Sequence, residues 1–417
     1  MRVIGWRGVY RAMILNAGYN ECSGSDFTIR AVRGQSMQVE FHHSIDELKQ
    51  TEWDALVRND NPFLKYAFHA ALEHHDCVGR KFGWMPCHLV IRDDERMIGL
   101  SPLYIKTNSY GEFVFDHAWA DAYQRSGMRY YPKMVSAIPY TPAYGERLLV
   151  APDSNADQLR REMITATRQL AIESDFSSMH WLFTTREEGM LLRSMGMLER
   201  LGVQFHWRNQ AYEDFDHFLA RLRAKRRKNI RQERRKVIDA GIRFRVLHGD
   251  EVSDSEWRLF AGFYAKTFEE RYSLATLNSG FFQEVGRSLG EQVVLILAYD
   301  GAACIAGALL YRSSSVLYGR HWGALHHYDS LHFETCYYQG IEYAIKHGLQ
   351  RFEPGAQGEH KIWRGFLPVQ TRSYHWISDP QFSLAIGEFL SREAPAIMDY
   401  EKSLLSSSPY RDISFPE

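Results

Sequence analysis

The chain has 417 residues, of which 45% are hydrophobic, 24% charged and 14% aromatic, and its formal net charge is −1. These values describe a globular protein of about two domains, and the near-neutral charge excludes a uniformly basic or acidic protein. The five cysteines show no CxxC spacing, so we expect reduced thiols rather than a disulfide framework or a zinc site. No apolar run approaches about 18 residues, so we expect no membrane span and interpret the protein as cytoplasmic.

Residues 1–36 open the chain with Arg2, Arg7 and Arg11 among scattered apolar residues. A secretory signal needs a continuous apolar segment, and Arg11 interrupts the apolar residues between positions 9 and 15. We interpret residues 1–36 as a disordered N-terminal extension, with a basic amphipathic targeting stretch as the alternative. Order is expected to begin around Gln38.

Residues 37–106 contain clear strand and helix signals. Residues 37–57 predict a strand followed by a helix, with Ser44 as N-cap and Glu47 completing a capping box. Residues 61–75 carry apolar side chains at helical spacing after an Asn-Pro pair. Residues 88–106 predict a β-hairpin around the charged turn Asp-Asp-Glu.

Residues 110–148 hold six tyrosines, one tryptophan and three prolines. Such a stretch predicts a long, rigid, irregular connection, and long connections inside compact domains are often functional. We interpret it as the wall of a pocket, and a purely structural aromatic cluster is the alternative. The candidate substrate-binding residues in it are Asp116, Asp121, Tyr123 and Arg125.

A basic helix is predicted over residues 215–240. Its segment 221–236 has ten Lys or Arg residues against one Glu, while a narrow apolar stripe supplies one buried seam. Cations at this density repel one another unless an anion lies nearby. Arg227, Lys228 and Arg231 share one side of the helix and are the candidates for binding phosphate, of a nucleotide cofactor or of RNA. The alternative is a solvated face that pairs with acids elsewhere.

The second half repeats the elements of the first. Residues 292–312 predict a second hairpin turning at Asp300-Gly301, and a strand, a helix ending at Gly348 and another strand follow. This order predicts an α/β (α+β) fold built as a tandem repeat of one domain type. The expected division is an N-terminal extension at 1–36, a first domain at 37–200, a second domain at 201–395 and a C-terminal tail at 396–417.

Histidines cluster with Glu334 and Cys336 in the stretch 321–336, and this composition suggests a metal at first sight. No HExxH or similar helical pair is present, so we expect no metal and instead expect acid–base use of one His or Glu. Glu334 begins the predicted helix, where the helix dipole lowers the pKa of a carboxylate unless burial raises it. Glu334 is therefore a candidate catalytic residue or an electrostatic anchor.

The stretch "RFEPGAQGEHKIWRGFLP", residues 351–368, brings acids, a histidine, a lysine and flexible backbone together. Gly355 and Gly358 permit positive φ and exposed backbone amides, which beside Lys361 suit a phosphate or a developing oxyanion. Glu359 and His360 are the candidates for accepting a proton from an amine. The alternative is a tight glycine turn carrying surface charges.

Three motifs, "FDHAWADAY", "HFETCYYQ" and "PGAQGEHKIWRGF", together resemble the FemAB-like (peptidoglycan-biosynthesis-like) family of the GNAT acyltransferase superfamily, over about residues 38–395. The lysine followed by a glycine-aromatic pair, Lys361 with Gly365 and Phe366, is typical of Fem-like proteins. The resemblance implies two GNAT-like domains, each a mixed, mostly antiparallel sheet flanked by helices, and transfer of an acyl group to an amine.

Two donors are known among such relatives, acyl-CoA and aminoacyl-tRNA. The GNAT pyrophosphate loop reads R/Q-x-x-G-x-G/A, and its nearest match, beginning at Arg320 and continuing through Gly323, fails at Leu325. We predict an N-acyltransferase that uses acyl-CoA and acts on a small-molecule or peptide amine. The alternatives are an aminoacyl-tRNA-dependent Fem-type transferase of cell-wall peptide synthesis, with tRNA as a partner, and a non-catalytic ligand-binding protein on a GNAT scaffold.

Overall fold

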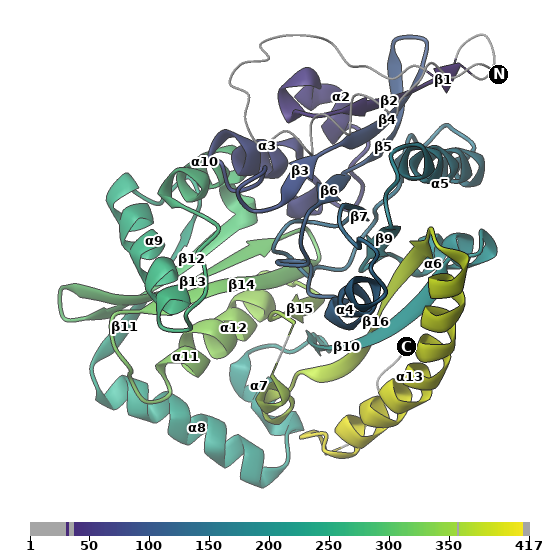
Figure 1. Cartoon of the computed structure of the whole chain (residues 1–417). Helices are drawn as coiled ribbons and strands as arrows, with labels where there is room; N and C mark the ends of the chain where they lie inside the picture. Colours follow the sequence, from purple (N-terminus) through teal and green to yellow (C-terminus); the bar gives the residue numbers. More distant parts are fainter. Residues whose placement is uncertain (1–30, 33–36, 357, 412–417) are drawn as a thin grey trace. The chain divides into compact units, whose positions relative to one another are not determined.

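The computed structural model of the chain describes residues 31–32, 37–356 and 358–411, and it divides into two compact units (Figure 1). Unit 1 consists of Met1–Arg58, Val78–Leu201 and Arg372–Ala394, and unit 2 of Asn59–Cys77, Gly202–Thr371 and Pro395–Glu417. The units therefore differ from a sequential division into residues 37–200 and 201–395, because each takes segments from the other half of the chain. Most of the extension 1–36 lies outside the described residues, although Ala31–Val32 forms a strand (β1) that pairs with the next strand.

The elements of unit 1 form two sets of paired strands, ordered β1-β2-β4-β5-β8 and β16-β9-β7-β6-β3. The pairs are antiparallel except for β7 with β9. Three elements, β10 (Leu198–Arg208), β16 (Leu367–Ile377) and α13 (Pro380–Ser406), carry the chain from one unit to the other. The remaining elements of unit 1 are β2 (Met37–His42), η1 (Ile45–Glu47), α2 (Gln50–Asp54), β3 (Trp84–Pro86), β4 (His88–Asp93), β5 (Arg96–Ser101), β6 (Tyr104–Lys106), α4 (His117–Arg125), β7 (Lys133–Ser136), β8 (Leu149–Val150), α5 (Ala156–Glu173), β9 (Ser178–Leu182) and α6 (Arg186–Ser194).

The strands of unit 2 run in the order β11-β12-β13-β14-β15-β10, again with one parallel pair, β14 with β15 (Figure 1). Its elements are η2 (Pro62–Leu64), α3 (Tyr66–His74), α7 (Phe215–Arg221), α8 (Ala224–Asp239), β11 (Ile242–His248), α9 (Asp254–Glu269), α10 (Ser279–Leu289), η3 (Gly290–Gln292), β12 (Val293–Asp300), β13 (Ala303–Arg312), β14 (Val316–Ala324), α11 (Leu331–Phe333), the π-helix η4 (Glu334–Tyr338), α12 (Gln339–Lys346), β15 (Arg351–Glu353) and η5 (Glu359–Arg364). Unit 2 thus contains one mixed, mostly antiparallel set of strands flanked by helices, whereas unit 1 contains two sets, one antiparallel throughout and one mixed.

Both predicted hairpins are present, as β4–β5 and β12–β13. The continuous apolar run of β12 follows from burial of both its faces, because successive side chains of a strand point to opposite sides. On one face Ile296 joins a core with α12, and on the other Leu297 lies near Gly307 and Phe260 of α9. A side chain at Gly307 would approach both within about 3 Å, so α9 packs closely on the sheet.

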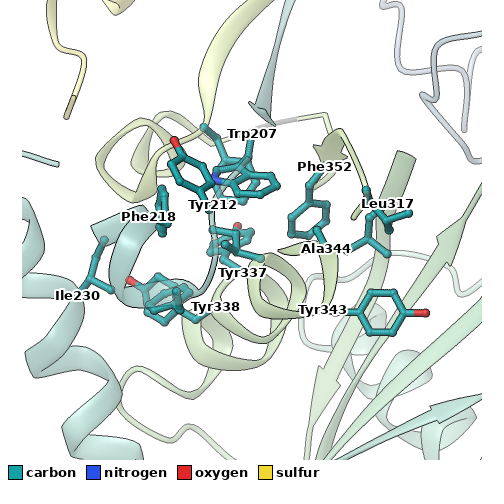
Figure 2. Close-up of a cluster of buried hydrophobic side chains, with 14 of the residues drawn as sticks. Trp207, Tyr212, Phe218, Ile230, Leu317, Tyr337, Tyr338, Tyr343, Ala344 and Phe352 are labelled. Carbon is teal, nitrogen blue, oxygen red and sulfur yellow. The ribbon is translucent and has the colours of Figure 1, made fainter. Parts of the chain in front are cut away.

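The core of unit 2 joins its strands to α7, α8 and α12 through aromatic side chains. Figure 2 shows Trp207 of β10, Phe352 of β15 and Tyr337 of η4 in this cluster. Ile230 of α8 reaches the same cluster and is 1% exposed. With Val237, it anchors a helix whose other described side chains are partly or fully exposed. The basic helix is therefore held by a narrow apolar seam, as its sequence predicts.

Two local predictions were wrong, and a third was confirmed only in part. The basic helix is interrupted at Leu222 and Arg223 and forms α7 and α8, because Leu222 turns into the core in extended backbone. Ser44 is an N-cap as predicted, but it caps the short η1 by accepting from the N–H of Asp46 rather than of Glu47, and α2 follows separately. Residues 110–148 are not a continuous irregular connection, since they contain α4 and β7.

Of the described residues, no helix combines the length and apolarity needed to cross a membrane.

Candidate active site where two parallel strands part

The parallel strands β14 and β15 pair only over Val316–Tyr318 and Arg351–Glu353. β15 ends there, whereas β14 continues to Ala324. On its other edge, β14 pairs with β13 through a register shift that leaves Arg320 as an extra residue. Such bulges bend a strand and are frequent beside active sites. The two strands therefore part just before a bulge of β14.

Lys361 of η5 lies at this parting. Its Nζ donates a hydrogen bond of 2.8 Å to the carbonyl of Gly355, two residues beyond β15. A Cβ at Gly355 would lie 3.7 Å from the carbonyl oxygen of Gly319 on β14 and 3.9 Å from Lys361 Nζ. The lysine, the end of β15 and the bulged strand are thus within a few ångströms of one another, and Lys361 itself is only 3% exposed.

Burial determines the charge of Lys361. It lowers the pKa of the ammonium to about 7, and repulsion from Arg320 acts in the same direction. Burial likewise raises the pKa of the nearby Cys336 thiol, so this thiol is uncharged. A lysine with such a pKa is partly neutral at physiological pH. It can accept a proton from a substrate amine and return it later as an acid.

The glycines before Lys361 are required by the backbone. Gly355 and Gly358 have φ of 94° and 112°, in the region that favours glycine. A Cβ at Gly358 would lie 2.5 Å from the ring of His360. These residues thus form the tight turn that places Lys361, and their use as amide donors to an oxyanion stays a prediction.

Arg364 holds η5 in place through contacts in several directions. Its guanidinium donates to the carbonyl of His360 at 2.9 Å, to Tyr338 Oη at 3.1 Å and to Glu233 Oε1 at 2.7 Å. Tyr338 donates in turn to Glu233, and the guanidinium lies 3.5 Å from the ring centroid of Phe333. Arg364, Tyr338 and Glu233 thus form a clamp that joins η5 to the π-helix and to α8, although Glu233 lies more than 100 residues before the other two in sequence.

Replacing Arg364 by Lys is expected to lower kcat about 10- to 100-fold with little change in KM, because one ammonium cannot reproduce the planar set of donors that positions Lys361. Steady-state kinetics with an activated acyl donor and an amine acceptor measure this effect. Arg258→Lys, at an exposed position of α9, is the matched control. An unchanged kcat in Arg364→Lys would show that Lys361 needs no such clamp.

Glu334 lies in the π-helix, where both its oxygens are occupied. Arg234 of α8 donates to them at 3.0 and 3.1 Å, and Gln339 donates at 2.8 Å. Burial raises the pKa of Glu334, against the effect of the arginine. Arg234 also binds Glu342, so the pair fastens α8 to this helix. This arrangement favours the anchor interpretation of Glu334 over the catalytic one.

Glu359 and His360 begin η5 but point to different surroundings. Glu359 is exposed and accepts a hydrogen bond of 2.6 Å from Tyr400. His360 Nε2 lies 3.1 Å from Tyr337 Oη, and burial lowers the pKa of the imidazole. Their predicted role as proton acceptors remains a prediction, and the geometry brings Lys361 rather than Glu359 to the parting of the strands.

The candidate phosphate-binding residues Arg227, Lys228 and Arg231 all lie on α8, whereas Arg320 lies on β14, and their binding of phosphate stays a prediction. Arg227 bonds the carbonyl of Leu222 at 3.4 Å, Arg231 pairs with Asp216 at 2.8 Å, and Lys228 is exposed. Arg320 is the bulge residue of β14, and burial lowers its pKa to about 10. Residues 320–324 are strand rather than a phosphate-binding loop, so the weak match to the pyrophosphate motif does not correspond to such a loop here.

In unit 1, the four candidate substrate residues lie on α4 or at its N-cap but have different surroundings. Asp116 is buried and accepts from Lys133, Ser109 and Tyr130. Tyr123 is 1% exposed and stacks on Phe382. Asp121 and Arg125 are exposed. Their use as one substrate site stays a prediction.

The sequence interpretation missed several buried charged residues, Lys106, Glu112 and Lys133 in unit 1 and Arg364 in unit 2, and also the half-buried Arg234. Only one feature of the sequence could have indicated them, namely a lysine in an otherwise apolar strand, such as Lys133 in the segment "KMVS". Within the part of the chain that the structure describes, no group of three His, Cys, Asp or Glu residues could hold a metal ion.

A profile of the FemAB-like family, described as peptidoglycan biosynthesis/recognition, matches residues 44–412. Among solved structures, FemX is 12% identical and superposes with a TM-score of 0.51, covering 82% of this chain and 98% of FemX. A search of curated proteins found no match.

Two further solved structures are similar. A tandem GNAT protein of the clavulanic acid pathway is 11% identical, with a TM-score of 0.44 and coverage of 82% of this chain and 99% of its own. The C-terminal domain of a putative lysylphosphatidylglycerol synthetase from Agrobacterium fabrum is 10% identical, with a TM-score of 0.48 and coverage of 82% and 96%. The predicted α/β (α+β) fold class, with two units built of mostly antiparallel strands flanked by helices, is confirmed.

Proposed function

Because the chain belongs to the FemAB-like family, we propose that it is a transferase that moves an acyl group from an activated donor to an amine of a peptidoglycan-related acceptor. The observation that carries this proposal is Lys361, a buried lysine with a pKa of about 7 at the parting of β14 and β15. A neutral proton acceptor in that place suits attack by an amine, which must lose a proton to form an amide.

In the proposed reaction the acceptor amine attacks the donor carbonyl, so that a C–N bond forms and the bond from the carbonyl to sulfur or oxygen breaks. The neutral Lys361 takes the proton that the attacking nitrogen loses. As an ammonium, it then stabilises the oxyanion and protonates the leaving thiolate or alkoxide. Glu359 and His360, the bases expected from sequence, are tested in parallel as Glu359→Gln and His360→Ala.

The proposed donor is acyl-CoA, and one observation favours aminoacyl-tRNA as a second candidate. Lys225, Lys228 and Arg235 of α8 are exposed. Arg226 lies 4.8 Å from the ring centroid of Trp363, which is 47% exposed. An exposed aromatic ring beside several cations is suited to stacking on a base while neighbouring cations contact phosphates.

The two donors are distinguished by turnover and by the salt dependence of binding. With aminoacyl-tRNA as donor, changing Lys225, Lys228 and Arg235 to Gln is expected to weaken binding. The slope of log Kd against the logarithm of the salt concentration should decrease by about 2. Each lost phosphate contact removes about 0.7 to 0.9 from that slope. With acyl-CoA as donor, the same variant should transfer at the wild-type rate.

The matched control changes three exposed cations of unit 1, Lys49, Lys81 and Arg161, to Gln. An equal loss of tRNA binding in this control would show that binding depends on the overall positive charge of the protein rather than on a site on α8. Ligand binding without turnover of either donor would instead support a non-catalytic recognition protein. That result would overturn the transferase proposal.

A further inference from the structure

The loop between β6 and α4 in unit 1 has inverted polarity. Its aromatic side chains point outward, with Tyr110 75% exposed, Phe113 36% and Phe115 53%. Its two carboxylates, Glu112 and Asp116, are 3% and 2% exposed. A loop in water normally places charges outside and aromatic rings inside. This loop is therefore organised for surroundings other than water.

The inward carboxylates are fixed by one buried lysine. Lys133 Nζ donates to Glu112 Oε2 at 2.8 Å, to Ser109 Oγ at 3.1 Å and to Asp116 Oδ2. Asp116 accepts further bonds from Ser109 and Tyr130. These bonds hold both ends and the middle of the loop, so its acids cannot turn outward without leaving Lys133 buried and unpaired.

Hydrogen bonds from other residues of unit 1 also fix the backbone of the loop at Tyr110. The carbonyl of Tyr110 accepts from the indole of Trp84 at 3.0 Å and from Lys106 Nζ at 3.1 Å. Phe113 has φ of 60°, which is unfavourable for a bulky residue. A strained backbone at a partly exposed phenylalanine indicates that the surrounding bonds maintain the conformation of the loop.

We propose that this loop, residues 108–116, is a docking element that inserts its aromatic side chains into the interface of an anionic lipid bilayer. Tyrosine and phenylalanine side chains partition to this depth, and withdrawal of both carboxylates removes repulsion from lipid phosphates. Two cations follow on the same segment, since Arg125 and Arg129 are exposed. The exposed acids near them are Asp121 and Asp175, the latter 4.0 Å from Arg129.

A bilayer fits this element better than a protein partner does. A stable protein interface needs a shaped, well-packed core around its aromatic residues. Here three aromatic residues are exposed within six positions of one loop, and they line neither the groove at α13 nor the groove at α9. A fluid interface accommodates projecting rings without complementary shape.

Co-sedimentation of the full-length protein with vesicles tests the proposal. Wild-type protein is expected to bind vesicles of phosphatidylcholine with phosphatidylglycerol more strongly than phosphatidylcholine alone. Changing Tyr110 to Ser, Phe113 to Asn and Phe115 to Ser should lower the partition coefficient at least about tenfold, because each ring loses its apolar contact with lipid. Asparagine tolerates the positive φ of position 113.

The matched control changes Tyr272 and Leu274 of unit 2, which are 101% and 61% exposed, to Ser. This control should bind as wild type does. Circular dichroism verifies the fold of each variant. In wild-type protein, energy transfer from tryptophan to a dansyl lipid provides a second readout that needs no variant. No transfer and no sedimentation, equal binding by the loop variant, or an equal loss in the control would each overturn the proposal.

Discussion

Lys361→Met is expected to lower kcat/KM about 10²- to 10⁴-fold while leaving the protein at least as stable as the wild type. The activity falls because the proton acceptor at the parting of β14 and β15 is removed. The stability does not fall because burial disfavours the lysine's charged form, so an apolar side chain of similar length suits the site. Steady-state kinetics and thermal unfolding on the same preparations measure both effects.

The pH dependence of this effect has a definite sign. The pKa of Lys361 is lowered from 10.5 to about 7 in the folded chain, so between these values the unfolded chain binds more protons. The wild type therefore gains stability as pH rises through this window, and below about 7 the destabilisation is complete. Lys361→Met should be the more stable protein at pH 6, by a margin that disappears near pH 10. Wild-type kcat/KM should rise with pH and level off above about 7.

The matched control is Lys346→Met, an exposed lysine of α12. It should change neither activity nor the pH dependence of stability. A Lys361→Met protein with wild-type kcat/KM would exclude the lysine as base. If Glu359→Gln or His360→Ala alone abolished turnover, the role would pass to that residue.

Lys133→Met is expected to destabilise unit 1 by about 3–5 kcal/mol, because it leaves two carboxylates buried without their cation. Burial opposes the charge on Lys133, but Glu112 and Asp116 together raise its pKa, so it is an ammonium. Burial raises the pKa of Glu112 to about 7, whereas the pKa of Asp116 is lowered, chiefly by Lys133 acting against burial. Calorimetric unfolding or loss of hydrogen-exchange protection in unit 1 measures the change.

Neutralising Glu112 and Asp116 in the same variant should restore much of the lost stability. In Lys133→Met with Glu112→Gln and Asp116→Asn, we expect at least half of the lost free energy to return, because no uncompensated charge remains. The matched control is Lys49→Met. Lys49 is exposed and its Nζ lies 3.8 Å from Glu52 Oε1, so this change should lower the free energy of unfolding by less than about 1 kcal/mol. A single Lys133→Met variant within about 1 kcal/mol of wild type would mean that water reaches the cluster.

Much of the fold could be predicted because its signals are local. The hairpin turn at Asp300-Gly301 and the helix stop at Gly348 follow from backbone preferences of single residues. The assignment of segments to the two units could not be predicted. Residues 59–77 pack in unit 2 through contacts such as Phe63 with Tyr311, at 5.0 Å between centroids, about 250 residues away in sequence.

The candidate site was predictable only in part. Its glycines and Lys361 are adjacent in sequence, so their grouping was visible. The burial that changes the charge of Lys361 was not visible, nor was the clamp of Arg364, Tyr338 and Glu233, whose members come from three separate elements. The Tyr-rich segment likewise gave no sign that Glu112, in the loop before α4, turns inward to Lys133 of β7.

The amino-acid sequence by itself therefore determined the tandem α/β fold, the basic surface of α8 and the stretch that contains the site, because periodicity, turn residues and charge are properties of neighbouring positions. Only the tertiary structure decided which charged groups are buried and with what partners. That outcome depends on desolvation and on distances between residues far apart in the chain, and these determine why Lys361 can act as a base while Glu334 is held as an anchor.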